Sequence, residues 1–386
     1  MRVTQPIPDA LHHEGFDIFK FDDFPEYTRE WVFARPLDFM RTQVEGLCAQ
    51  LEARGPLASV NVVINSASRI NAIVIPRKDF SVISLNAGAL VRIRQMFHFA
   101  VSVEQVFPRR KNERLVADDE CERFGVRPEI LLQRVDLSLR ARKASDQDYA
   151  HLFGPVPISV ERFGLAQSLA VVAIDYIVMH EFAHIARNHV ALSGGSRARP
   201  SFSEASRYTG ALRTSIRKTK DLVWRQLLEI DADNMGADLS SSKFIAPQIV
   251  DPCWHGWART PQQAFELWAF AVLMTFQLFS GSTHKGSWRH QSHPPPTPRL
   301  VVLLTALHAH LEQDNHLSKA AMLRATTAAM SKARRVWAHL GLPRRRSTLF
   351  ANGEAVLPVA NELVERYNEE MLPLIEDVHI WRPRGY

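Results

Sequence analysis

Apolar residues recur at the spacing of amphipathic helices from residue 165 onwards. The first of these segments begins with an almost unbroken apolar run from Leu165 to Val178. The pattern predicts six helices, near residues 165–190, 220–240, 261–280, 298–312, 318–340 and 356–371. This part of the chain is therefore expected to be helical.

The preceding part of the chain has a different pattern. In residues 58–90, β-branched runs are broken by "NSAS" and "PRKD", which predicts two or three short antiparallel strands. Residues 31–54 read as mainly helical, whereas residues 97–164 mix charge-rich pieces with a modestly apolar middle. The expected fold class is α+β, mostly helical with a small antiparallel sheet.

One apolar segment, Ala264–Phe279, is long enough to raise the question of a membrane-spanning helix. Its sixteen residues reach about 24 Å as a helix, short of a hydrocarbon core of roughly 30 Å. Glu266 and Gln277 interrupt it, and Thr260 and Gln263 form the N-terminal capping pattern of a helix. We therefore predict a buried core helix and no transmembrane segment.

The composition is that of a folded globular protein, because 46% of the 386 residues are apolar and 23% are charged. The three cysteines, Cys48, Cys121 and Cys253, form no Cys-x-x-Cys pair, so neither a disulfide framework nor a cysteine-based zinc site is predicted. The first fifteen residues lack the apolar stretch of a secretory signal. These features together favour a reducing, cytoplasmic location.

The net charge of +6 is concentrated in three basic stretches, residues 213–220, 331–337 and 343–347. Such stretches can attract nucleic acid or acidic partners. No nucleic-acid-binding motif accompanies them, and few aromatic residues lie between the charges. We expect a solvated basic face and no specific nucleic-acid partner.

The most informative motif is His-Glu-x-x-His, in the stretch "MHEFAHIARNH" at residues 179–189. In a helix, His180 and His184 lie on one face, one turn apart, where two imidazoles can bind one Zn²⁺. Glu181 then lies beside the metal, where a carboxylate can take a proton from a water molecule that zinc activates. Alone the motif is weak, because a helix with two partly buried histidines gives the same pattern. His189 is about 140° around the helix from His184 and is interpreted as a capping or surface residue.

A second predicted helix offers a third ligand. The stretch "LLEIDADNMGA" places Glu229 and Asp233 four residues apart on one helix face. Glu229 can complete a His₂Glu site that leaves the fourth zinc position open, as catalytic sites do. Asp233 can accept the free ring N–H of a ligand histidine and fix its tautomer. Asp231 points elsewhere and is interpreted as a surface residue. Such acidic pairs are also common on solvated helix faces.

Four separated stretches of the chain resemble, in order, the motifs of one metallopeptidase family. They are "INAIVIP" with the following "FSVISLNAGAL", then "HEFAHIARNH", "LLEIDADNMGADL" and "SHPPPTPRL". The family is the gluzincin group that contains the CAAX prenyl proteases and the bacterial heat-shock-induced protease X, with its soluble relatives. The resemblance covers residues 55–95 and 165–312.

The resemblance implies a zincin-like fold in which the small antiparallel sheet lies beside the His-Glu-x-x-His helix. It implies that His180, His184 and Glu229 bind one zinc ion and that Glu181 is the general base. It further implies that His293 stabilises the oxyanion that forms on the scissile carbonyl.

The same resemblance assigns substrate binding to the strand that contains Asn71, Ala72 and Ile73. An exposed strand edge would let an extended peptide add as one more strand. Arg299 is expected to brace the loop that carries His293.

The chain departs from this family in two places. The interval between the two metal-binding helices is polar and basic where membrane-embedded members carry apolar hairpins, which puts prenylated protein substrates in doubt. Residues 97–164 lengthen the interval before the catalytic helix and are interpreted as an insertion that covers or extends the cleft. The predicted organisation is a helical lead-in (1–57), a metallopeptidase domain with this insertion (58–312) and a helical extension (313–386).

We therefore expect a zinc-dependent endopeptidase that acts on protein or peptide substrates with narrow specificity. Two alternatives stay open: a non-catalytic sensor or regulatory protein that keeps the zinc fold, and a site-specific protease of the toxin or phage-exclusion type. Glu181 and His293 argue against the first alternative, because a protein without catalysis need retain neither. The sequence does not indicate the oligomeric state.

Overall fold

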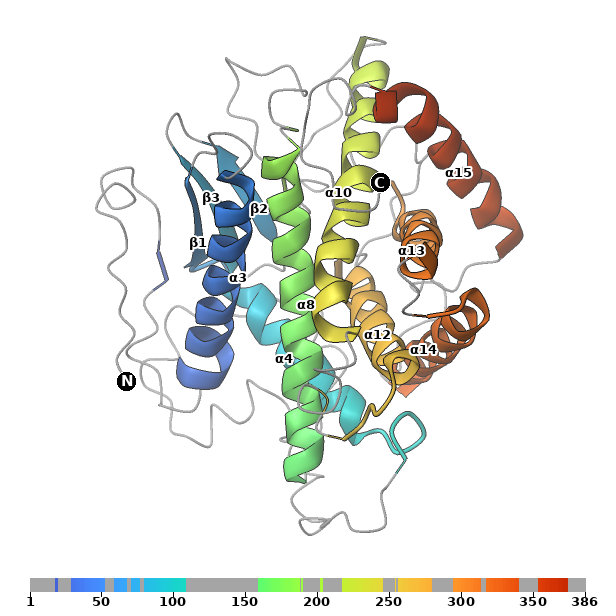
Figure 1. Ribbon diagram of the computed structural model, residues 1–386. Coiled ribbons are helices and arrows are strands. Elements are labelled where there is room, and N and C mark those ends of the chain that lie inside the picture. Colours follow the sequence, from blue (N-terminus) through green and yellow to red (C-terminus); the bar gives the residue numbers. More distant parts are fainter. Residues whose placement is uncertain are drawn as a thin grey trace.

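The structure is a computed structural model, mostly helical with one small sheet (Figure 1). It describes residues 18–19, 29–52, 59–67, 71–76, 80–108, 159–187, 189, 202–203, 217–245, 254, 256–279, 294–313, 317–339 and 353–373. The expected α+β class is confirmed at this level.

All six helices predicted from the apolar pattern, and the helix of the lead-in, are present with ends shifted by a few residues. The helices are α3 (Arg35–Glu52), α4 (Ala87–Ser102), α8 (Val160–Ala186), α10 (Arg217–Ile245), α12 (Pro261–Phe279), α13 (Pro296–Gln313), α14 (Lys319–His339) and α15 (Gly353–Arg366), with the π-helical turns η1 (Arg29–Ala34) and η8 (Tyr367–Met371). The strands are β1 (Ser59–Asn65), β2 (Ala72–Pro76), β3 (Phe80–Asn86) and β4 (Phe202–Ser203).

The sheet is mixed, with the strand order β1-β3-β2-β4. β2 is antiparallel to both β3 and β4, whereas β1 runs parallel to β3. The expectation of a purely antiparallel sheet is therefore wrong for β1. β3 lies between β1 and β2 and is buried at every residue except Phe80, which suits a central strand. Strand order is not visible in an apolar pattern, and the parallel pair follows from it.

The outer edge of β2 is not free in the described structure. Ile73 and Val74 pair with the two residues of β4, Ser203 and Phe202. The neighbouring Ala72 is fully buried. The prediction of an exposed substrate-binding edge is thus wrong at Ile73, because a later segment of the chain pairs there.

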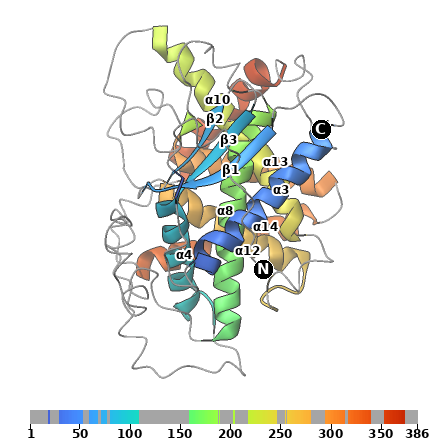
Figure 2. The same cartoon turned by 90° about the vertical axis from the view of Figure 1, so that its left-hand side faces the viewer.

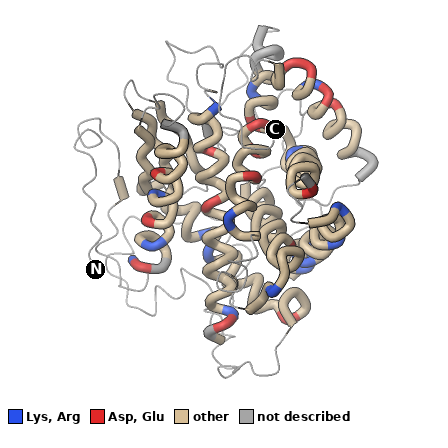
Figure 3. Tube along the Cα trace, viewed as in Figure 1, with Lys and Arg blue, Asp and Glu red and all other residues tan. Residues whose placement is uncertain are grey.

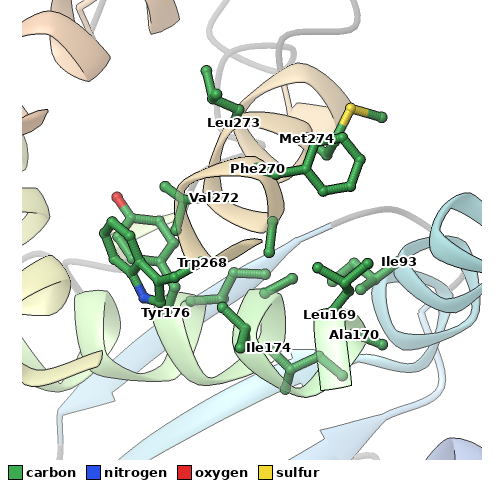
Figure 4. Close-up of a cluster of buried hydrophobic side chains, with 14 of the residues drawn as sticks. Ile93, Leu169, Ala170, Ile174, Tyr176, Trp268, Phe270, Val272, Leu273 and Met274 are labelled. Atoms are coloured by element: carbon green, nitrogen blue, oxygen red, sulfur yellow. The ribbon is translucent and has the colours of Figure 1, made fainter. Parts of the chain in front are cut away.

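Helix α8 runs through the middle of the molecule, with the sheet on one side and α10 and α12 on the other (Figures 1 and 2). Its apolar residues pack with those of α4 and α12, as Figure 4 shows for Leu169, Ile93 and Phe270. Full burial of one such side chain contributes about 1.5–3 kcal/mol. The same core includes Met40 of α3 and Met322 of α14, so the lead-in and the extension share it.

The long apolar helices serve this core. One helix in the described part of the chain, Glu161–Ala186, is long and apolar enough to cross a membrane, and 83% of its most apolar window is buried inside the protein. The segment Ala264–Phe279 lies in α12 and is buried, as predicted. The predicted cap is also present: Thr260 Oγ1 accepts from the backbone N–H of Gln263 at 3.3 Å, and Gln263 Oε1 accepts from that of Arg259 at 2.8 Å.

The ends of the predicted insertion, residues 97–164, belong to α4 and α8. Residues 109–158 lie outside the described part of the chain.

Part of the basic stretch 331–337 has a structural role. Lys332 Nζ donates to the carbonyl of Val106 at 3.1 Å, and Arg335 Nη1 donates to that of Gln105 at 2.6 Å. These contacts tie α14 to the turn that follows α4. Arg335 is exposed, as the solvated face predicts, whereas Lys332 is partly buried. The side chains of the other two basic stretches lie outside the described residues.

A glycine sets the distance between α8 and α10. A Cβ atom on Gly236 would lie 2.8 Å from the backbone nitrogen of His180 and 2.9 Å from its Cα. These are backbone atoms, so they cannot move aside by a change of rotamer. Gly236 therefore allows α10 to approach α8 at the first histidine of the motif.

We predict that Gly236→Ala destabilises the fold by about 1–3 kcal/mol, the usual cost of overpacking. The control is Gly46→Ala in α3, where an added Cβ meets nothing within 4 Å. That change should stabilise by about 0.5–1 kcal/mol, as alanine does in helices. Denaturant unfolding of both variants in a metal chelator measures the difference without a contribution from bound metal. Equal effects of the two substitutions would contradict the role of Gly236.

Candidate metal centre

Two helices bring three potential metal ligands together. His180 and His184 lie one turn apart on α8, with their Nε2 atoms 3.3 Å apart. Glu229 of α10 faces them: its Oε2 lies 3.5 Å from His180 Nε2 and its Oε1 lies 3.7 Å from His184 Nε2. One ligand atom from each of the three lies within 4.8 Å of the others, and all three residues are buried. This group could hold a metal ion.

Asp233 lies beside the first histidine, one turn beyond Glu229 on α10. Its Oδ1 is 3.0 Å from His180 Nδ1, the ring nitrogen that faces away from the ligand group. A carboxylate at this distance favours a hydrogen on Nδ1, and the lone pair of Nε2 is then free for a metal. The geometry suits the role that the sequence assigned to Asp233.

Two further side chains hold Asp233 in place. Arg299 donates to it twice, from Nε at 2.7 Å and from Nη2 at 2.8 Å, and the Tyr176 hydroxyl donates at 2.9 Å. Burial raises the pKa of Asp233, but the charge and hydrogen bonds of Arg299 and His180 outweigh it, so the pKa lies below its usual value. Asp233 is therefore an ionised acceptor.

Arg299 also reaches the ligand Glu229, with Nη2 3.5 Å from its Oε2. The sequence predicted that Arg299 braces the His293 loop. The contacts of the described residues place it against Asp233 and Glu229, and His293 lies outside the described part of the chain.

His189 and Asp231 are both buried, at 0% and 1% exposure. Their interpretation as surface residues is therefore wrong. His189 Nε2 lies 2.9 Å from Asp231 Oδ2, and its Nδ1 lies 2.8 Å from Nδ1 of His184. Asp231 also accepts from the Tyr367 hydroxyl at 2.6 Å.

The position of His189 follows from the end of α8. The angle of about 140° from His184 assumed that the helix continues. α8 ends at Ala186, and Arg187 has φ −92° and ψ 3°, outside the helical values. The angle of a continuous helix therefore does not apply to His189, whose Nδ1 lies 2.8 Å from Nδ1 of His184.

Asp231 is kept ionised by its surroundings. Burial raises its pKa, but the hydrogen bond with His189 and the charge of Arg187 lower it more. Arg187 Nε lies 3.4 Å from Asp231 Oδ2. The pKa of Asp231 therefore lies below its usual value.

The buried charges around the ligand group do not balance within the described residues. Four buried carboxylates stand against two buried guanidinium groups: Glu181, Glu229, Asp231 and Asp233 against Arg187 and Arg299. Figure 3 shows acidic positions along α10 where it passes α8. Buried charges are normally paired or coordinate a metal, so a divalent cation suits the remaining negative charge.

A proton on His180 also offsets part of this negative charge. Burial lowers the pKa of His180, but Asp233 and Glu229 raise it well above its usual value. The donor set of two imidazoles and one carboxylate, each imidazole with a partner on its other nitrogen, fits zinc.

Two other features adjoin the ligand group. Glu181 follows His180 on α8 and is buried at 1% exposure. A mainly apolar pocket opens beside His180, lined also by Tyr176, Ile177, Thr275, Phe276, Phe279, Pro296 and Arg299.

No protein-family model matches this chain, and the searches of curated proteins and of solved structures gave no significant match. The resemblance to the gluzincin family stays a prediction that rests on the four sequence stretches.

We predict one zinc ion per chain, and its loss in His180→Ala and in His184→Ala, because each change removes one of three ligands. The control is His339→Ala, at an exposed position on α14. Metal analysis by mass spectrometry after gel filtration measures the zinc content. One equivalent of zinc retained in both ligand variants would contradict the assignment.

Proposed function

We propose that this protein is a zinc-dependent endopeptidase that hydrolyses peptide bonds in protein or peptide substrates. The observation that carries the proposal is the buried group of His180, His184 and Glu229, with the carboxylate of Glu181 next to it in sequence on α8. Three protein ligands are the number that leaves a position for chemistry in catalytic zinc sites.

The three ligands would hold the ion, and Asp233 and His189 would hold the two ligand imidazoles. When bound, zinc supplies a Lewis acid that polarises a carbonyl group and lowers the pKa of water. Arg299, paired with Asp233 and close to Glu229, offsets the negative charge of the ligand shell.

Glu181 is the proposed general base. Its carboxylate accepts a proton from the attacking water and then donates it to the leaving amine, so that atoms and charges balance over the reaction. Burial restricts its exchange with bulk solvent, which suits a group that transfers one proton within the site.

A mainly apolar pocket adjoins His180, on the side of the proposed zinc site. Its lining favours a nonpolar group of the substrate next to the scissile bond. The edge of β2 pairs with β4 at Ile73 and Val74, so no substrate strand is assigned to it there. A small apolar pocket as the contact beside the ligand group favours narrow specificity.

Glu181→Gln tests the chemistry, because the amide keeps the shape of the side chain but cannot accept the proton. We expect unchanged zinc content and a loss of peptide cleavage of about 10²–10⁴-fold or more. The measurement compares new protein N-termini in cells that produce the wild type or the variant, with Glu365→Gln, at an exposed position on α15, as the control.

N-termini that appear with the wild type and with Glu365→Gln, but not with Glu181→Gln, support the proposal. Identical sets of N-termini with and without Glu181 would refute it and leave a non-catalytic zinc protein.

His293→Ala tests the oxyanion role that the resemblance implies. The variant should keep its zinc and lose kcat by about 10²–10³-fold, the usual effect of removing one oxyanion donor. Steady-state kinetics on a cleaved peptide and metal analysis are both needed. A variant that loses its metal would show that His293 is a ligand.

A further inference from the structure

Among the described residues, the outer nitrogen of the second ligand histidine faces another histidine. His184 Nδ1 lies 2.8 Å from Nδ1 of His189, whose Nε2 lies 2.9 Å from Asp231 Oδ2. The first ligand has the direct arrangement, with Asp233 3.0 Å from His180 Nδ1. His180 therefore faces a carboxylate directly, whereas His184 is linked to a carboxylate through a second histidine.

The carboxylate of Asp231 determines where the ring hydrogens of His189 and His184 lie. An ionised carboxylate can only accept, so Asp231 fixes the ring hydrogen of His189 on Nε2. Nδ1 of a neutral His189 then carries a lone pair and can only accept. His184 must therefore donate from Nδ1, which leaves its Nε2 lone pair toward Glu229 and the ligand group.

The opposite arrangement would prevent metal binding. A hydrogen on Nδ1 of His189 would make His184 Nδ1 the acceptor and move the hydrogen of His184 to Nε2. Nε2 faces His180 at 3.3 Å and Glu229 at 3.7 Å, where a metal ion must lie. The state of His189 thus decides whether His184 can be a ligand.

The series of hydrogen bonds that begins at His184 ends at Tyr367, near the C-terminal end of the described residues. Tyr367 of η8 donates to Asp231 Oδ1 at 2.6 Å. Tyr367 also packs against a small apolar cluster of Leu227, Leu228 and Met371, which joins η8 to α10 just before Glu229. The C-terminal turn therefore orients Asp231 from outside the His-Glu-x-x-His helix.

We propose that His189 is the positioning residue of His184. Asp231 orients the ring of His189, and Tyr367 orients Asp231. The turn η8, which carries Tyr367, therefore forms part of the metal centre. The inference rests on the metal centre of the proposed function and not on its peptidase chemistry.

The test measures zinc affinity of the full chain by competition with a chromophoric chelator. His189→Leu removes the acceptor and should weaken zinc binding by about 10- to 100-fold, as loss of such an outer partner does. His189→Asn offers an amide oxygen near the position of Nδ1 and should restore affinity to within a few-fold of the wild type. Tyr367→Phe should weaken binding by a few-fold.

The control is a second buried pair of the same kind. His310 Nε2 lies 2.6 Å from Asp238 Oδ1, between α13 and α10, outside the ligand group. His310→Leu should leave zinc affinity unchanged. Unfolding of every variant in chelator measures the stability of the metal-free fold, so that a general loss of structure is separated from a loss of affinity.

A second readout does not depend on any variant. Nitrogen-15 NMR of the zinc-loaded wild type, with labelled histidine, distinguishes protonated from bare ring nitrogens. We expect hydrogens on His184 Nδ1 and on His189 Nε2. A hydrogen on His189 Nδ1, or wild-type zinc affinity in His189→Leu, would overturn the inference.

The outcomes separate this inference from the proposed function. A wild type that binds no zinc would refute both. A wild type that binds zinc and cleaves nothing would refute only the peptidase, and the effect of His189 on zinc affinity would still decide the inference.

Discussion

The candidate site depends on the close approach of α8 and α10 at Gly236. At this point the two backbones are too close for any side chain on α10, because a Cβ would lie 2.8 Å from the backbone nitrogen of His180. Glu229 and Asp233 lie seven and three residues before Gly236, on the same face of α10. The same close approach therefore brings Glu229 to Nε2 of His180 and Asp233 to its Nδ1. Two of the buried carboxylates have a guanidinium partner on another helix or at its end, Asp233 with Arg299 and Asp231 with Arg187.

The two histidines of the candidate site show how a buried polar network can fix the tautomer of an imidazole. A neutral imidazole has one donor and one acceptor nitrogen, and only the partner on the outer nitrogen determines which is which. Asp233 acts on His180 directly, with Arg299 and Tyr176 holding it. Asp231 acts on the tautomer of His184 indirectly, through the ring of His189. The network extends from α8 to α10, α13 and η8, so segments far apart in sequence have to be packed before both lone pairs point to one position.

Local sequence patterns predicted what is local in this structure. The six helices predicted after residue 165 are found where the 3.6-residue period placed them, whereas α4 was not predicted. The grouping of His180, His184 and Glu229 follows from helical spacing once α8 and α10 are neighbours. The parallel pairing of β1 with β3 and the pairing of β4 with β2 are long-range and leave no periodic signal. The prediction of a surface position for His189 is wrong because its angle of about 140° holds only for a continuous helix, and α8 ends at Ala186. Gly236 is part of the stretch "LLEIDADNMGA", but the sequence does not show why a glycine is needed there. The need arises from the contact with the backbone of α8.

The proposed zinc site takes two imidazoles from α8 and one carboxylate from α10. X-ray absorption at the zinc edge of the purified full-length protein measures these ligands. Nitrogen and oxygen neighbours are expected at about 2.0–2.2 Å, with the multiple-scattering pattern of two imidazoles. The chain has three cysteines, so a sulfur ligand is chemically possible. A sulfur neighbour at about 2.3 Å, or a shell without imidazole, would exclude a site made of His180, His184 and Glu229.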